Sequence, residues 1–81
     1  MAPTRISVVR VEEKSKAHLV HWLSDGRYVL ENRHARAQAR WSLWEPRVGP
    51  AAGGTFQREG SSLGQLLKWA ARHPYTPRSA G

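Results

Sequence analysis

Three polar residues in the middle of the chain alternate with alanines and could bind phosphate groups. On an extended strand, Arg36, Gln38 and Arg40 would point to one face at a spacing of about 6.5 to 7 Å, comparable with successive phosphates of a nucleic acid. A guanidinium group presents a planar fork that suits two phosphate oxygens at once. The patch could extend to three further arginines, namely Arg27, Arg33 and Arg47. The alternative is an edge strand that carries charge so that it does not pair with another molecule.

Two of the four tryptophans could contribute aromatic stacking. Trp22 and Trp44 fall on the mostly polar faces of their predicted strands. An exposed indole beside arginines can stack on bases or anchor a protein interface. Alternatively, these indoles cover a second, small hydrophobic cluster. Trp41 and Trp69 follow apolar positions and are expected in the core.

Nothing in the sequence indicates a metal site, a catalytic centre or a cofactor. The chain has no cysteine, which excludes a disulfide, a thiolate zinc site and a cysteine nucleophile. His18 and His21 would point to opposite faces of a strand, so they could not share an ion. The six carboxylates show no paired arrangement, and helix capping explains the serines at 61 and 62. We therefore expect a binding protein rather than an enzyme.

The charge favours a polyanionic partner. Lys and Arg number 13 against 6 Asp and Glu, for a formal net charge of +7, and residues 26–81 carry nine of these cations against three acids. Eighty-one residues suffice for one small domain. The longest nearly apolar stretch, residues 17–23, is too short to cross a bilayer, and the N-terminus lacks the layout of a secretory signal. The composition thus predicts a cytoplasmic protein that does not contact membranes.

Strands are predicted at residues 5–11, 17–23 and 28–30 from their β-branched and apolar residues. Asp25-Gly26 between apolar runs is a strong hairpin signal. A two-residue loop at this point places Leu23 opposite Tyr28 and Trp22 opposite Val29. The predicted core face of this hairpin carries Leu19, His21, Leu23, Tyr28 and Leu30. The other face carries His18, Val20, Trp22, Arg27, Val29 and Glu31.

The segment from residue 32 to 45 can be interpreted in two ways. Its apolar and polar residues alternate strictly, which favours a strand over 36–44. If it is a helix instead, Arg33, Arg36 and Arg40 line one stripe. The glycines and prolines of residues 45–54 predict a loop, and residues 55–58 could form a short extended piece.

An amphipathic helix is predicted over residues 62–73. Leu63, Leu66, Leu67 and Ala70 recur at helical spacing. Ser62 and Gln65 match a capping box at its start, and a proline at 74 stops it.

These elements predict an α+β fold, with a small antiparallel sheet of three to four strands and one C-terminal amphipathic helix packed on one face. A single domain would span residues 4–73, followed by a flexible tail, 74–81. The helix is expected to meet a set of sheet residues made up of Leu19, Leu23, Tyr28, Leu30, Trp41 and Leu43. The outline of three strands and one helix resembles small DNA-binding domains that lay a sheet into a groove, including the arm-binding domains of phage-type integrases. This resemblance assigns no role to any residue.

We therefore predict a non-enzymatic nucleic-acid-binding accessory or regulatory protein, with DNA favoured over RNA. The arginine row would hold the phosphate backbone, and Trp22 or Trp44 would pack on bases or sugars. The alternative is a small protein of the phage or mobile-element kind that binds and inhibits an acidic host protein, for example a nucleic-acid-processing enzyme. The chain could also form a homodimer through the strand that carries residues 36–44.

Overall fold

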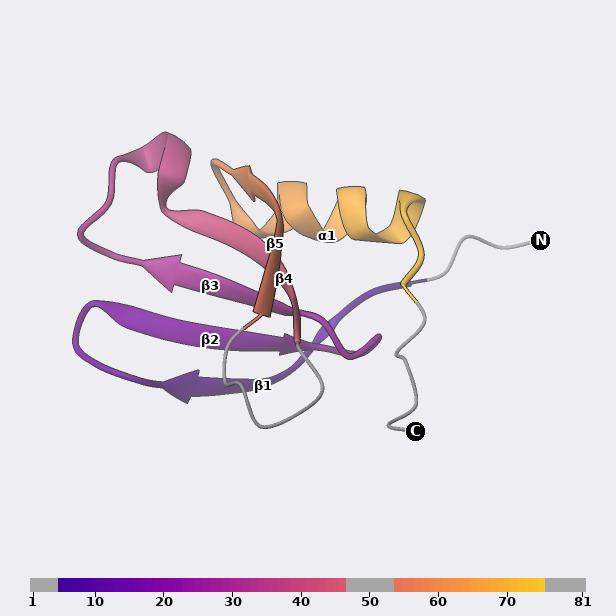
Figure 1. The fold of residues 1–81 in the computed structure, drawn as a ribbon, viewed down its shortest axis with the longest axis horizontal. Helices are drawn as coiled ribbons and strands as arrows, with labels where there is room; N and C mark the ends of the chain where they lie inside the picture. Colours follow the sequence, from indigo (N-terminus) through magenta and orange to yellow (C-terminus); the bar gives the residue numbers. More distant parts are fainter. Residues whose placement is uncertain (1–4, 47–53, 76–81) are drawn as a thin grey trace.

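A single antiparallel sheet of five strands, in the order of the chain, forms the body of the molecule (Figure 1). The computed structural model describes residues 5–46 and 54–75. The strands are β1 (Val8–Glu13), β2 (His18–Leu23), β3 (Tyr28–Asn32), β4 (Trp41–Pro46) and β5 (Gly54–Gly60), and a helix α1 (Leu63–Arg72) follows. The α+β class, the antiparallel sheet and the C-terminal helix are confirmed, but the sheet has five strands and not three to four. The tail beyond Tyr75, at residues 76–81, lies outside the described residues.

The loop of the β2–β3 hairpin is one residue longer than predicted and begins one residue earlier, at Ser24. Leu23 donates to the Arg27 carbonyl at 2.8 Å, and Gly26 donates to the Leu23 carbonyl at 3.1 Å. These bonds enclose a three-residue loop whose last residue, Gly26, has a φ of 99°. A glycine at positive φ after a turn is the usual ending of such a loop. The strand partners are therefore Trp22 with Tyr28 and His21 with Val29, and the predicted pairing of Leu23 with Tyr28 is wrong.

This shift exchanges the two faces of β3. Residues directly opposite on antiparallel strands share a face. Seven hydrophobic residues are buried among the described ones. Six of them form the core between the sheet and α1, namely Ile6, Leu23, Val29, Leu43, Leu66 and Ala70. The seventh, Val20, lies on the opposite face beside its strand partner Leu30. Val29 thus takes the core position predicted for Tyr28 and Leu30, which lie on the opposite face.

Only the C-terminal part of the strand predicted over residues 36–44 forms a strand. Residues Ala37–Ala39 form a short 3-10 helix, η1, and β4 begins only at Trp41. The Asn32 side-chain oxygen accepts a bond from the His34 backbone N–H at 3.1 Å. The Asn32 backbone N–H donates to the Arg40 carbonyl at 2.8 Å, which closes the connection as a loop. An Asn side chain that bonds to the backbone two residues ahead favours such a turn over a strand. Moreover, β4 lies between β3 and β5, so it offers no free edge for the predicted self-association.

The helix agrees with its prediction. Ser62 is the N-cap, its hydroxyl accepts a bond from the Gln65 N–H at 3.2 Å, and His73 is the C-cap. The Gln65 side chain accepts from Ser61 at 2.9 Å, one residue before the position that the capping box predicted. Leu66 and Ala70 are buried, and α1 packs over the β4–β5 side of the sheet (Figure 1). No helix among the described residues is long and apolar enough to span a bilayer.

Candidate functional site

Four aromatic side chains form a continuous row across the sheet. Trp22, Tyr28, Trp44 and Phe56 come from β2, β3, β4 and β5, and each is the direct strand partner of the next. The ring centroids of successive members lie 5.2, 6.4 and 5.4 Å apart. The Tyr28 and Trp44 rings are nearly parallel, at 4°, while the outer pairs are tilted or edge-on. We call these four residues the aromatic row.

The aromatic row lies on the face of the sheet opposite α1. Val29 and Leu43 contact the helix side, so their neighbours Tyr28 and Trp44 point to the other side. The helix α1 packs on the other face, where its Leu66 and Ala70 join Val29 and Leu43 in the core. Phe56 is 50 % exposed, and the other three members are partly exposed. The row is thus a surface of aromatic rings that reaches solvent.

Hydrogen bonds within the protein hold the polar edges of the two indoles. The Trp44 Nε1 donates to the Ser42 hydroxyl at 2.8 Å, and the Trp22 Nε1 lies 3.5 Å from the Glu12 carboxylate. Arg10 on β1 extends the row, since its guanidinium carbon lies 5.5 Å from the centroid of the Trp22 ring. The indole N–H groups of the row are therefore already engaged within the protein, which leaves the rings themselves and the Tyr28 hydroxyl for other contacts.

A glycine makes room for the centre of the row. A Cβ atom at Gly54 would fall on the Tyr28 hydroxyl and 2.6 Å from the Glu45 carbonyl oxygen. The Tyr28 side chain therefore passes over Gly54, where any residue with a side chain would collide with the Tyr28 hydroxyl. Burial raises the pKa of the Tyr28 phenol, so the ring is uncharged at neutral pH.

Exposed basic residues gather at one end of the sheet. The β1–β2 turn and the β3–β4 connection lie side by side (Figure 1, left), and the Arg33 N–H donates to the Ala17 carbonyl at 2.8 Å. The two segments carry five exposed cations, Lys14, Lys16, Arg33, Arg36 and Arg40. We call these five residues the basic end. From Tyr28 to the last residue of β3 is about 13 Å along the strand, so the basic end is within reach of a chain of several nucleotides on the row.

The basic end differs from the predicted arginine row. Arg36, Gln38 and Arg40 are exposed, but they lie on and around η1 and do not share the face of a strand. Within the described residues Arg36 and Arg40 form no ion pair, whereas Lys14 bonds to Glu12 at 3.1 Å. This bond is the main cause of the lowered pKa of the Glu12 carboxyl. The unpaired arginines are therefore more available to a phosphate than Lys14 is.

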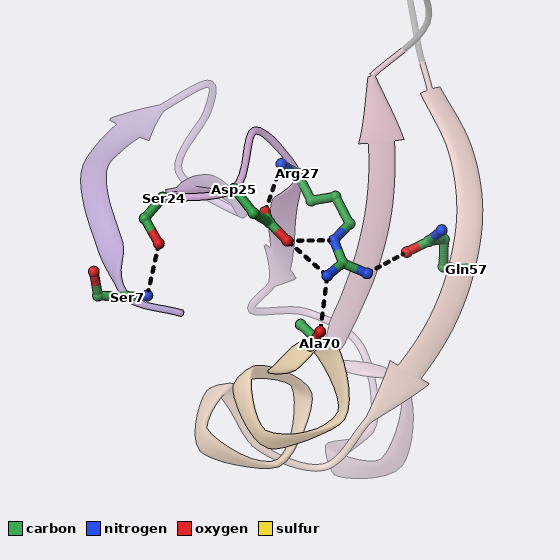
Figure 2. Close-up of polar contacts among 6 residues, drawn as sticks. All are labelled: Ser7, Ser24, Asp25, Arg27, Gln57 and Ala70. Carbon is green, nitrogen blue, oxygen red and sulfur yellow. Dashed lines mark hydrogen bonds and ion pairs between the residues drawn. The ribbon is translucent and has the colours of Figure 1, made fainter. Parts of the chain in front are cut away.

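Arg27 is a structural residue and not a phosphate contact as predicted. Its side chain is 1 % exposed and holds three parts of the fold together (Figure 2). The guanidinium donates to Asp25 at 2.6 and 2.7 Å, to the Gln57 side chain at 3.1 Å and to the Ala70 carbonyl at 2.9 Å. The start of β1 is tied to the same hairpin, because the Ser7 N–H donates to the Ser24 hydroxyl at 3.1 Å (Figure 2). A buried guanidinium with all its partners inside the protein cannot reach a ligand.

Sequence reasoning identified half of the aromatic row. It singled out Trp22 and Trp44, and the structure places these two on one face, with Tyr28 between them. Tyr28 was missed because the hairpin register was one residue off, and Phe56 because its strand was not recognised as part of the sheet. A three-residue loop ending at Gly26 is the signal that would have joined Tyr28 to Trp22. Arg47 lies outside the described residues, and Trp41 and Trp69 pack against the core as predicted.

Comparisons with known proteins give no relative for this chain: no family model, no curated protein and no solved structure matches it.

Proposed function

We propose that the protein is a non-enzymatic binding protein for single-stranded nucleic acid, with bases stacked on the aromatic row and phosphates held at the basic end. The observation that carries the proposal is the row itself, a line of partly exposed rings across four strands on the face that the helix leaves open. Sheet faces with aromatic side chains are a common platform for unpaired bases. Bases within a duplex are stacked on one another, so such a row favours a single strand.

Charge supports the same partner. The net charge of +7 attracts a polyanion, and three arginines of the basic end lie on one ordered connection. The aromatic face itself carries few charges, with Arg10 beside Glu12 at 3.9 Å. The row would thus bind bases through stacking, while the phosphate contacts come from the end of the sheet. This division predicts weak dependence on base sequence.

Tryptophan fluorescence during titration with an oligothymidylate of about 15 nucleotides tests the proposal. Binding should quench the fluorescence and weaken as salt rises from about 50 to 200 mM. Phe56→Ala should weaken binding roughly fivefold or more, since stacking contributes about 1 to 3 kcal/mol per base. Val9→Ala is the matched control, because Val9 is 65 % exposed and lies off the row.

The basic end is tested by two double variants of equal net charge. R36A/R40A removes two cations from the basic end, and K68A/R72A removes two exposed cations from α1. The first should reduce the slope of log affinity against log salt by about 1, because each neutralised phosphate contributes about 0.7. The second should leave the slope nearly unchanged.

Three results would contradict the proposal. One is no binding of oligothymidylate or oligouridylate at low salt. Another is equal weakening by the two double variants, which would indicate a general effect of charge. The third is capture of an acidic protein after nuclease treatment, with the Phe56→Ala variant failing to capture it; this would favour the inhibitor of an acidic host protein.

A further inference from the structure

We propose that the outer edge of β1 pairs with the β1 strand of a second copy, antiparallel and with Val11 on the two-fold axis. This inference does not depend on the proposed function. In the strand order, β1 is an edge strand, and among the described residues no strand lies on its outer side. Unpaired edges present free N–H and C=O groups that favour pairing with another chain.

The free edge strand β1 carries exposed apolar side chains. Of the three large hydrophobic side chains that are exposed within the described part of the chain, two lie on this edge, Val9 at 65 % and Val11 at 51 % exposure. Natural edge strands usually carry lysine, proline or a bulge that prevents pairing. A bulge does occur between Val8 and Arg10, but pairing with β2 is regular from Arg10 to Glu13. The regular segment is therefore the part available to a partner strand.

Along this segment, the direction of the backbone N–H and C=O groups alternates in the way that pairing about Val11 requires. The Lys14 N–H donates to the His18 carbonyl at 3.0 Å, so Lys14 faces β2. Because the direction alternates along a strand, Arg10 and Glu12 also face β2, while Val11 and Glu13 turn their N–H and C=O groups outward. With Val11 on the axis, the two copies of this residue exchange a symmetric pair of hydrogen bonds.

The charged side chains of β1 also favour a two-fold axis through Val11. Arg10 and Glu12 are equally distant from Val11, so each Arg10 lies opposite the second copy's Glu12, and this pairing occurs twice by symmetry. An axis through Arg10 or Glu12 would instead place two like charges opposite each other, which is unfavourable. Within one chain the Arg10 and Glu12 side chains are only loosely paired, at 3.9 Å, while Glu12 also accepts a bond from Lys14 at 3.1 Å. In the dimer the second copy's Arg10 would add to these contacts of Glu12.

Such a dimer has a continuous ten-stranded sheet. Directly opposite residues share a face, so both aromatic rows lie on the same side, with the two Arg10 side chains between them. The interface is small, because only β1 contributes to it. We therefore expect a reversible dimer whose population depends on concentration.

Sedimentation equilibrium of the full chain without nucleic acid, from about 1 to 500 µM, tests the dimer. The mass should approach twice 9.1 kDa as the concentration rises. R10E and E12R each place like charges opposite each other twice, and each should raise the dimer Kd roughly tenfold or more. R10E/E12R restores opposite charges and should return the Kd to within about threefold of the original.

A second pair of variants tests the axis. Val11→Lys brings two cations together on the axis and should abolish the dimer. Val9→Lys replaces a still more exposed valine of the same strand, near the second copy's Glu13, and should preserve the dimer. Thermal unfolding of each variant at low concentration verifies that the monomer is folded. A monomer at every concentration, growth beyond two copies, or failure of R10E/E12R to recover would overturn the proposal.

Discussion

Arg27→Lys separates the structural role of Arg27 from a role in binding. The substitution keeps the positive charge but replaces the fork with a single ammonium group. The ammonium can remain beside Asp25, which contacts Arg27 through two nitrogens in the native protein. It cannot also reach Gln57 on β5 and the Ala70 carbonyl on α1, because these acceptors lie on different sides of the guanidinium (Figure 2).

The expected cost follows from those two bonds. A hydrogen bond from a charged group contributes about 1.5 to 3 kcal/mol. The Ala70 carbonyl keeps a bond from the His73 N–H at 3.2 Å, and Gln57 is partly exposed and can turn to water, so the lower end of the range applies to each. We expect Arg27→Lys to reduce the free energy of unfolding by about 2 to 3 kcal/mol, out of roughly 4 to 12 for a domain of this size.

Urea unfolding followed by tryptophan fluorescence measures this loss. With a slope near 1 kcal/mol per molar, the midpoint should fall by about 2 to 3 M. Arg33→Lys is the matched control, since its side chain is exposed and the change should stay within about 0.5 kcal/mol. The structural role would be refuted if Arg27→Lys left the free energy of unfolding unchanged and weakened oligonucleotide binding. Arg27 would then be a contact to the nucleic acid, as the sequence predicted.

Local geometry predicts the effects of three further substitutions and one titration. Gly54→Ala should destabilise the fold by about 1 to 3 kcal/mol and alter the near-UV circular dichroism of the aromatic row, because the new methyl group meets the Tyr28 hydroxyl and the Glu45 carbonyl; an unchanged spectrum would contradict this. Ser62→Ala should lower Tm by about 4 to 8 °C through loss of the N-cap, which contributes about 1 kcal/mol. Gly64→Ala, two residues away with nothing within 4 Å of its Cβ position, should raise the free energy of unfolding by about 0.5 kcal/mol. Tyr28 should titrate above its ordinary pKa of 10.0 in absorbance at alkaline pH; because the folded state favours the neutral phenol, the stability this group contributes is present below pH 10 and is lost as pH rises through the raised pKa.

The helix was predictable because its signals are local. Ser62 and Gln65, the leucine spacing and Pro74 act within one element, and the observed helix begins and ends within one residue of the prediction. The sheet was less predictable. Alternation at residues 36–44 indicated a strand, but alanine and arginine tolerate a turn equally well, and the Asn32 side chain decides in favour of the turn. β5 was seen only as a short extended piece because its exposed residues show no apolar face.

The candidate site depended on a single residue of register. A β-strand alternates its side chains with a period of two, so a shift of one residue exchanges its faces completely. The two-residue loop would have put Tyr28 in the core and left Arg27 on the surface with Trp22. The three-residue loop does the opposite: Arg27 moves under the helix and Tyr28 joins Trp22 on the open face.

The same loop explains why the register is fixed. Asp25 accepts a bond from the Arg27 N–H at 2.9 Å with one oxygen and binds the Arg27 guanidinium with the other. The carboxylate therefore favours the longer loop in two ways, through the bond to the backbone N–H and as the counter-charge of the buried guanidinium. The buried ion pair and the aromatic row are thus two consequences of one turn. If Arg27 is replaced by a residue that cannot pair with Asp25, the three-residue loop is no longer favoured over the two-residue one. Tyr28 then no longer stays beside Trp22. The free energy of unfolding and the quenching of Trp22 fluorescence by oligonucleotide should therefore decrease together.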